Sequence, residues 1–264
     1  KRIASLRSPS AAKRVPVDRV ALESASRATG SDDHDLAGFA FEGQTQIFGE
    51  LSNSRRYGML ACNGELRVLL ATRHMSLREA LNRLEINLLA KQIRIAFEAA
   101  RDDLGVAEPR VVLAGLNPHA GEGGAFGKEE SKILEPAIEM AEREYGFRAA
   151  GPAVPDVVFG EGVEGKWDVV IALYHDQAFI PLKLLGRDRA HTLFVGGKIL
   201  RVSPMHGAAY DIARSGQADP EPFAFAFDRA LEYATRRAET KQGASRSCPP
   251  FRHRARAPGR SVAV

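Results

Sequence analysis

One stretch of the sequence, VVLAGLNPHAGEGGAFG at residues 111–127, restricts the possible folds most strongly. Its apolar half, residues 111–116, predicts a buried strand that breaks at Asn117, and His119 follows almost at once. Four glycines then make a loop without bulky side chains, and an acidic pair that begins with Glu129 opens a helix. A strand, a glycine-rich loop and a helix N-terminus in this order are typical of sites at the carboxyl edge of a sheet in α/β proteins.

The preceding segments alternate between strands and helices. Residues 58–72 predict a hairpin whose turn is the Asn-Gly dipeptide at Asn63, which favours a type I′ turn. Apolar residues at helical spacing predict a helix over residues 87–104, and Gly105 ends it. The return strand of the hairpin, this helix and the strand at 111–116 predict a parallel pair of strands with a right-handed crossover.

The following segments continue the alternation. A helix is expected over residues 128–145 with Pro136 inside it, and a buried strand over residues 167–173. Thr45 and Ser76 are the expected N-caps of two shorter helices, because their hydroxyl groups accept hydrogen bonds from the first helical turn. Strands that alternate with helices place the chain in the α/β class.

Composition excludes several other classes of protein. The chain has 264 residues, of which 44% are hydrophobic and 27% charged, as expected for one large or two small globular domains. Its two cysteines, Cys62 and Cys248, have no CxxC spacing and support neither a zinc knuckle nor a disulfide framework, so a reducing cytoplasm is expected. No apolar run approaches the roughly 20 residues that a membrane span needs.

The net charge of +4 comes from the C-terminal end of the chain. Residues 241–264 contain six lysines and arginines, three prolines and no acidic residue, which predicts a basic disordered tail over residues 239–264. Nucleic-acid binding by this tail is the less favoured alternative, because it carries no known binding motif. Residues 39–238 form the expected α/β region, and residues 1–38 match no clear pattern.

Three histidines share one position relative to the predicted strands. His74, His119 and His175 each follow a predicted strand closely and lie in a polar segment. If these strands are neighbours, the imidazoles meet at one sheet edge and leave open positions on a divalent ion, as a catalytic metal requires. Imidazole suits zinc or cobalt, whereas magnesium prefers oxygen ligands. Spacing alone leaves open the alternative of three separate loop histidines.

Five longer segments of the sequence carry a resemblance to a known family. They are GQTQIFGEL (43–51), ATRHMSLREAL (71–81), GLNPHAGEGG (115–124), LYHDQAFIPLK (173–183) and RVSPMHGAAYDIARSGQADP (201–220). Together they resemble the 4-hydroxythreonine-4-phosphate dehydrogenases of vitamin B6 biosynthesis. The first is similar to the substrate loop of that family, and the second to the segment around its first metal histidine. The resemblance covers residues 40–235.

The resemblance implies a fold and an activity. The fold is a three-layer α/β/α arrangement related to the isocitrate and isopropylmalate dehydrogenases. The activity is the oxidation by NAD or NADP of a secondary alcohol on a phosphorylated four-carbon acid, followed by loss of carbon dioxide. A divalent metal (zinc, cobalt or magnesium) takes part, and the enzyme is a cytoplasmic homodimer whose two subunits complete each site.

The resemblance also assigns roles to residues of this chain. By position, the metal ligands are His74, His119 and His175, the substrate-binding residues are Gln44, Thr45, Lys183, Thr192 and Arg201, and the catalytic residues are Lys183 and Asp156. The lysine could bind an anionic group or relay a proton, and the aspartate could orient a ligand imidazole. A solvated helix lysine and a plain loop aspartate remain the alternatives.

The chain departs from the family pattern at several places. The family's opening segment, similar to Met-Gly-Asp-Pro-Ala-Gly-Ile-Gly-Pro-Glu, is absent, so part of the N-terminal domain is expected to be missing. Gln44 stands where the family has histidine, Gln46 where it has glutamate, and Thr192 where it has asparagine. Gln44 can donate and accept hydrogen bonds but cannot carry a proton.

These departures keep two alternatives open. One is the related branch that acts on erythronate- or threonate-4-phosphate, and the other is a remnant of the family with impaired catalysis. The choice between NAD and NADP is undecided, because no dinucleotide fingerprint with its acidic residue can be recognised.

Overall fold

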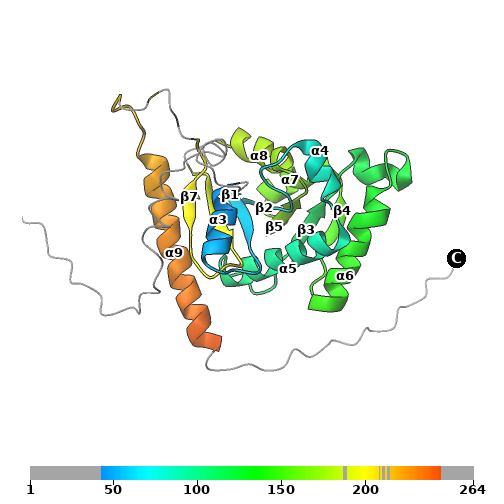
Figure 1. Cartoon of the computed structure of the whole chain (residues 1–264), viewed down its shortest axis with the longest axis horizontal. Coiled ribbons are helices and arrows are strands. Elements are labelled where there is room, and N and C mark those ends of the chain that lie inside the picture. Colours follow the sequence, from blue (N-terminus) through cyan, green and yellow to red (C-terminus); the bar gives the residue numbers. More distant parts are fainter. Residues whose placement is uncertain (1–42, 187–188, 208, 210–211, 213–214, 245–264) are drawn as a thin grey trace, which may run out of the picture.

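The computed structural model describes residues 43–186, 189–207, 209, 212 and 215–244 (Figure 1). The segment predicted at 1–38 and most of the predicted tail at 239–264 lie outside these residues. The last helix, α9 (Glu221–Ala244), extends into the first part of that tail. Within the described ranges, no helix combines the length and apolar character that a transmembrane span requires.

Seven strands of the described residues form one sheet in the order β4-β3-β5-β2-β1-β6-β7. They are β1 (Gly58–Asn63), β2 (Leu66–Leu70), β3 (Val111–Ala114), β4 (Ala150–Ala153), β5 (Val169–Ala172), β6 (His191–Val195) and β7 (Val202–Pro204). Strands β2 to β5 run parallel to one another, whereas β1 and β6 pair antiparallel with both their neighbours.

The predicted direct pairing of the hairpin's return strand with the 111–116 strand is wrong. The two strands, β2 and β3, are parallel as predicted, but β5 lies between them and pairs with both. All four residues of β5 are buried, so this apolar strand takes a central position with neighbours on both sides. Val170 therefore pairs with Val68 of β2 and with Val112 of β3.

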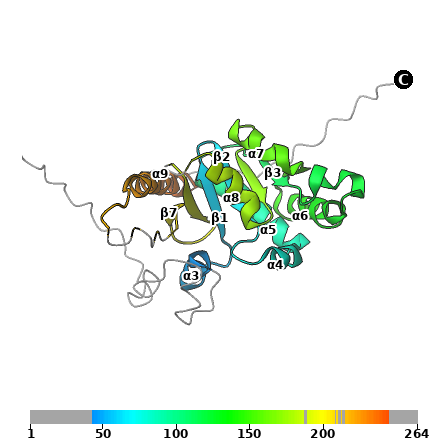
Figure 2. The ribbon, with the colours of Figure 1, turned by 90° about the horizontal axis from the view of Figure 1, so that it is seen from above.

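Helices cover both faces of the sheet, as Figures 1 and 2 show. The helices are α3 (Gln44–Leu51), α4 (Leu77–Asn82), α5 (Ile86–Asp102), α6 (Glu135–Tyr145), α7 (Pro155–Val163), α8 (His175–Leu184) and α9, with a 3₁₀ turn η1 (Pro118–Gly124) and a π turn η2 (Glu130–Leu134). One core cluster joins α5, α6 and Tyr233 of α9 to the sheet, and a second joins α7 and α8 to its other face. The predicted three-layer α/β/α arrangement is confirmed.

The hairpin of β1 and β2 turns one residue later than predicted. Asn63 pairs with Leu66, so Gly64 and Glu65 form the turn. Only Gly64 has a positive φ, 59°, which fits a type II′ turn and not the expected type I′ turn. The amide of Asn63 instead donates to the carbonyls of Leu182 and Gly186, at 2.9 Å each, and ties β1 to the end of α8.

Two predicted helix starts have different outcomes. Ser76 is confirmed as the N-cap of α4, since its hydroxyl accepts from the N–H of Glu79 at 3.3 Å. Thr45 is not an N-cap: Gly43 precedes α3, and the buried Thr45 hydroxyl contacts the sulfur of Met59 at 3.8 Å.

Pro136 changes the helix predicted over residues 128–145. The structure divides this segment into the π turn η2 and helix α6, which begins at Glu135 and has Pro136 in its first turn. Proline has no N–H to donate and is tolerated in a first turn, where that donor would have no helical partner. The wider π turn before it therefore replaces a continuous α-helix.

Candidate functional site

The carboxyl ends of β2, β5 and β3 are joined by side-chain hydrogen bonds at Leu173. The hydroxyl of Thr72 donates to the Leu173 carbonyl at 2.7 Å. Gln177 accepts from the Leu173 N–H at 2.7 Å and donates to the Gly115 carbonyl at 2.8 Å. Both side chains are buried, so they hold in register the three strand ends that carry the predicted histidines.

His74 and His175 lie together at this edge. Their ring centroids are 5.4 Å apart and their planes are tilted by 47°. His175 is the first residue of α8 and does not lie in a loop as predicted, and its Nδ1 is 2.9 Å from a carboxylate oxygen of Asp176. A carboxylate at Nδ1 favours the tautomer with the proton on that nitrogen, which leaves the Nε2 lone pair for a metal or a substrate.

The N-terminus of α3 packs closely against the first histidine of this pair. A Cβ atom on Gly43 would lie 2.9 Å from Nδ1 of His74, which is closer than ordinary packing allows. The absence of a side chain at Gly43 therefore lets the predicted substrate loop approach His74. Gln44 and Thr45 follow in the first turn of α3.

His119 lies apart from the other two histidines. It is exposed in the glycine-rich loop, and its ring centroid is 6.0 Å from that of Phe126. Its backbone is left-handed, with φ 53° and ψ 30°, and residues 119–123 all have positive φ. Across the described chain, no three His, Cys, Asp or Glu side chains are placed to hold a metal ion, so the predicted convergence extends to two histidines only.

A buried carboxylate fixes the loop that carries His119. One oxygen of Glu130 accepts from the N–H groups of Leu116 and Asn117, at 2.9 and 2.8 Å, and the other accepts from the Asn117 amide at 2.9 Å. Burial alone would raise the pKa of Glu130, but the hydrogen bonds from Asn117 and Leu116 outweigh burial and hold the pKa below its ordinary value. A Cβ atom on Gly121 would lie 2.7 Å from this carboxylate, so the loop also needs glycine there.

Two predicted substrate-binding residues contact each other. A guanidinium nitrogen of Arg201 donates to the side-chain oxygen of Gln44 at 2.5 Å. The Arg201 guanidinium also lies over the ring of Phe48, 5.5 Å from its centroid, and burial lowers the pKa of Arg201. Glutamine at position 44 thus holds the arginine by a neutral hydrogen bond, which leaves its positive charge available to an anion.

The other predicted site residues have different surroundings. Lys183 is exposed near the end of α8, and its ammonium lies 5.5 Å from the ring centroid of Phe179. Thr192 is buried in β6 and pairs with Ala61 and Ser203.

Asp156 is exposed in the first turn of α7. Among the described residues its carboxylate has no side-chain hydrogen bond or ion pair, so the structure shows no contact between it and a histidine. Asp176 is the carboxylate that contacts one of the paired histidines.

Sequence reasoning missed Thr72, Gln177 and Glu130, which position the predicted residues. Each is a buried polar side chain beside the end of an apolar strand or loop. Such a residue must find hydrogen-bond partners, and unpaired backbone groups at a strand end are the nearest candidates. For Thr72 and Gln177 the signal in the sequence is a polar residue next to an apolar strand segment, whereas Glu130 lies in a charged segment that gives no such signal.

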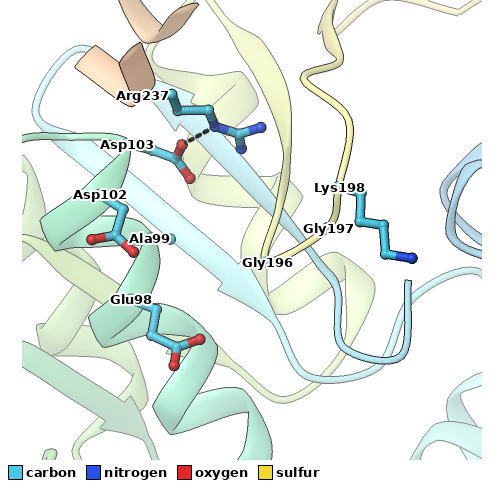
Figure 3. Close-up of a pocket in the computed structure, with 8 residues that line it drawn as sticks. All are labelled: Glu98, Ala99, Asp102, Asp103, Gly196, Gly197, Lys198 and Arg237. Atoms are coloured by element: carbon cyan, nitrogen blue, oxygen red, sulfur yellow. Dashed lines mark hydrogen bonds and ion pairs between the residues drawn. The ribbon is translucent and has the colours of Figure 1, made fainter. Parts of the chain in front are cut away.

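A cavity of about 490 Å³ lies elsewhere in the molecule (Figure 3). It is lined by Glu98, Ala99, Asp102, Asp103, Gly196, Gly197, Lys198 and Arg237. Arg237 donates to Asp103 at 2.5 Å, so part of its charge is neutralised internally. None of the predicted site residues lines this cavity, and the strand-end histidines remain the candidate site.

Comparisons with known proteins show which family this chain resembles. A sequence model of the family described as pyridoxal phosphate biosynthetic protein PdxA matches residues 31–230. The crystal structure of a 4-hydroxythreonine-4-phosphate dehydrogenase from Klebsiella pneumoniae aligns with a TM-score of 0.68 and 39% identity, over 78% of this chain and 62% of that one.

Two curated relatives carry different names. The 4-hydroxythreonine-4-phosphate dehydrogenase of Beijerinckia indica is 44% identical over 200 residues, which are 76% of this chain and 58% of the relative. The D-threonate 4-phosphate dehydrogenase of Pectobacterium atrosepticum is 39% identical over 198 residues, 75% of this chain and 60% of the relative. The chain therefore spans less than two thirds of the length of these relatives.

Proposed function

The chain belongs to the family of the pyridoxal phosphate biosynthetic protein PdxA, and from that premise we propose that it oxidises a phosphorylated hydroxy acid. The proposed substrate is 4-hydroxythreonine-4-phosphate or a close analogue, and the proposed oxidant is NAD or NADP. One observation carries the proposal: the N-terminus of α3 lies against His74, one member of the imidazole pair, and against the half-buried guanidinium of Arg201. Gly43 touches His74 there, and the next residue, Gln44, binds Arg201.

The residues at this site fit a divalent metal in part. His74 and His175 offer two imidazoles, and the Asp176 carboxylate on Nδ1 of His175 leaves Nε2 as the ligand atom. We propose His119 as the third ligand. When bound, a zinc or cobalt ion supplies a Lewis acid that lowers the pKa of the substrate hydroxyl. This donor set is less suited to magnesium.

The cationic residues of this chain suit an anionic substrate. Arg201, held by Gln44, presents a planar guanidinium that can bind a carboxylate or phosphate through two hydrogen bonds. Lys183 places a second positive charge on α8, eight residues after His175. We propose that Lys183 binds the anionic group of the substrate that Arg201 does not bind, or that it transfers a proton. We propose that Thr192 forms a hydrogen bond to the substrate.

We assign no residue of this chain to the binding of the nicotinamide cofactor. Its role would be to accept the hydride from the carbon that bears the alcohol, while the hydroxyl proton leaves. The keto acid that forms would then lose carbon dioxide. A homodimer with shared sites and a cytoplasmic location remain predictions of the resemblance, and Asp156 remains a predicted catalytic residue.

A second substrate is favoured by one observation. A relative named D-threonate 4-phosphate dehydrogenase is 39% identical to this chain, close to the 44% of a relative named for 4-hydroxythreonine-4-phosphate. The two substrates share a phosphate and a secondary alcohol, and the arginine and lysine described above suit both. The same site could therefore serve either substrate.

The test measures NAD(P)H formation by the purified chain with each of the two phosphorylated acids, with and without Zn²⁺ or Co²⁺. We expect metal-dependent turnover that His74→Ala and His175→Ala each abolish. Lys132→Ala serves as a control, because Lys132 is an exposed lysine in η2, outside the predicted site. Turnover that survives both histidine substitutions would contradict the proposal. Metal binding without turnover on either acid would favour a catalytically impaired member of the family.

A further inference from the structure

Phe179 contacts two of the predicted site residues with the same aromatic ring. The ring stacks on the imidazole of His175, with 4.4 Å between centroids and 16° between planes. The ammonium of Lys183 lies 5.5 Å from the centroid of the same ring. His175, Phe179 and Lys183 follow one another at intervals of four residues along α8, which places them on one face of the helix.

The stack restricts the orientation of His175. An imidazole parallel to a neighbouring ring loses that contact when it rotates about its Cβ–Cγ bond. Asp176 restricts the same ring through Nδ1, at 2.9 Å. A ring fixed by a hydrogen bond at one edge and by a stack on one face directs its Nε2 atom in a single direction. His74 lies 5.4 Å away, between ring centroids, so the relative placement of the two imidazoles depends on this orientation.

The same ring also restricts Lys183. A lysine side chain at the end of a helix has many rotamers, and an ammonium over an aromatic face favours a few of them. Lys183 is exposed, so the contact with Phe179 is the interaction that holds its amine near the face of α8 that carries His175. Phe179 itself is 7% exposed and belongs to the apolar cluster between α7, α8 and the sheet, so its ring has a fixed position.

We propose that Phe179 is a positioning residue that orients His175 for metal binding and holds Lys183 beside it. This inference rests on the proposed function, because it takes His175 as a ligand and Lys183 as a substrate or proton-transfer residue. The alternative is that Phe179 only fills the core, as an apolar side chain of any shape would.

The test is a titration of the metal-free full chain with Co²⁺, followed by visible absorption and calorimetry. Phe179→Leu and Phe179→Met keep an apolar side chain and remove the ring, whereas Phe179→Tyr keeps the ring. We expect Co²⁺ affinity to fall about three- to tenfold in Phe179→Leu and Phe179→Met, the range that corresponds to a lost aromatic stack, and to stay within about twofold in Phe179→Tyr.

Phe97→Leu is the matched control. Phe97 also stacks on another ring, that of Phe147, at 5.0 Å and 11°, but it packs on the opposite face of the sheet. We expect this variant to bind Co²⁺ like the unchanged chain.

In the metal-free protein, the ring protons of His175 should lose their upfield ring-current shift in Phe179→Leu and keep it in Phe97→Leu.

Two results would overturn the inference in different ways. If His175→Ala weakens Co²⁺ binding while Phe179→Leu and Phe179→Met bind as the unchanged chain does, then Phe179 only fills the core and the proposed function stands. If His175→Ala binds Co²⁺ as tightly as the unchanged chain, the metal site of the proposed function fails, and the role of Phe179 fails with it.

Discussion

The histidine pair and the loop of His119 are positioned in different ways. His74 and His175 follow short connections from β2 and β5, whose ends Thr72 and Gln177 tie together, and neither histidine has a positive φ. His119 lies in a loop whose residues 119–123 all have positive φ. The pair is positioned by the sheet, whereas His119 is positioned by its own loop.

This difference has an energetic consequence. Three of the five left-handed residues, namely His119, Ala120 and Glu122, are not glycine, and each costs roughly 1 kcal/mol in this conformation. The hydrogen bonds of Glu130 and Asn117 must offset that cost for the loop to keep its shape. We therefore expect the loop to depend on one carboxylate, and the pair on several weaker contacts.

The largest expected effect is that of Glu130→Ala. The substitution leaves the N–H groups of Leu116 and Asn117 without their acceptor and removes one of the two acceptors of the Asn117 amide, so we expect a loss of about 3 kcal/mol in the free energy of unfolding. Urea unfolding measures this loss. Glu129→Ala is the matched control, because it removes the other carboxylate that accepts from the Asn117 amide, at 2.8 Å, and should cost about 1 kcal/mol or less. Equal losses in the two variants would show that Glu130 does not hold the loop.

A smaller effect is expected at the strand ends. Gln177→Leu removes the two hydrogen bonds that join Leu173 to Gly115, and we expect it to cost about 2 kcal/mol in urea unfolding. Thr72→Val removes the hydrogen bond from the Thr72 hydroxyl to the Leu173 carbonyl, and we expect it to lower the free energy of unfolding by about 1 kcal/mol. A cost for Gln177→Leu no larger than that for Thr72→Val would mean that the strand ends are held by their backbone pairing alone.

Acid should remove the contribution of Glu130 to the free energy of unfolding. The pKa of Glu130 is lowered in the folded chain, so its stabilising effect is present above the ordinary pKa of 4.5 and is lost as the pH falls through the lowered folded value. The difference in unfolding free energy between the unchanged chain and Glu130→Gln should therefore be constant near neutral pH and shrink in acid. Urea unfolding of both proteins at a series of pH values measures it. A difference that grows in acid would contradict the assigned direction of the pKa.

The difference between the histidine pair and the loop of His119 also explains which parts of the fold and the site could be predicted from the sequence. Strands β1, β2, β3 and β5, most helices and the placement of His74 and His175 follow from apolar runs and from the residue that comes directly after each run, whereas β4 has no such run and its residues suggest a loop. The position of β5 between β2 and β3 does not follow from such runs either, because the order of strands in a sheet depends on packing across the whole core.

The parts of the site that could not be predicted depend on tertiary contacts or on backbone conformation. Glu130 reads in sequence as an acidic helix start, and only the fold shows that its carboxylate turns back to Asn117. The left-handed turn at His119 includes residues that rarely adopt positive φ, so the sequence favours another conformation there. The contact of Asp176 with His175, in place of one from Asp156, depends on where α8 begins.

The smallest change tests how the pair meets the substrate loop. Gly43→Ala would place a Cβ atom 2.9 Å from Nδ1 of His74, and the imidazole must then move by a few tenths of an ångström. Because a flexible side chain absorbs this shift, we expect the free energy of unfolding to fall by less than about 1 kcal/mol. The displaced imidazole should nevertheless bind Co²⁺ with a several-fold weaker affinity. Gly160→Ala is the matched control, since a Cβ atom there meets no atom within 4 Å. If both variants bind Co²⁺ equally well, the close approach of α3 to His74 has no part in the site; if only Gly43→Ala binds weakly, the substrate loop and the histidine pair form one unit.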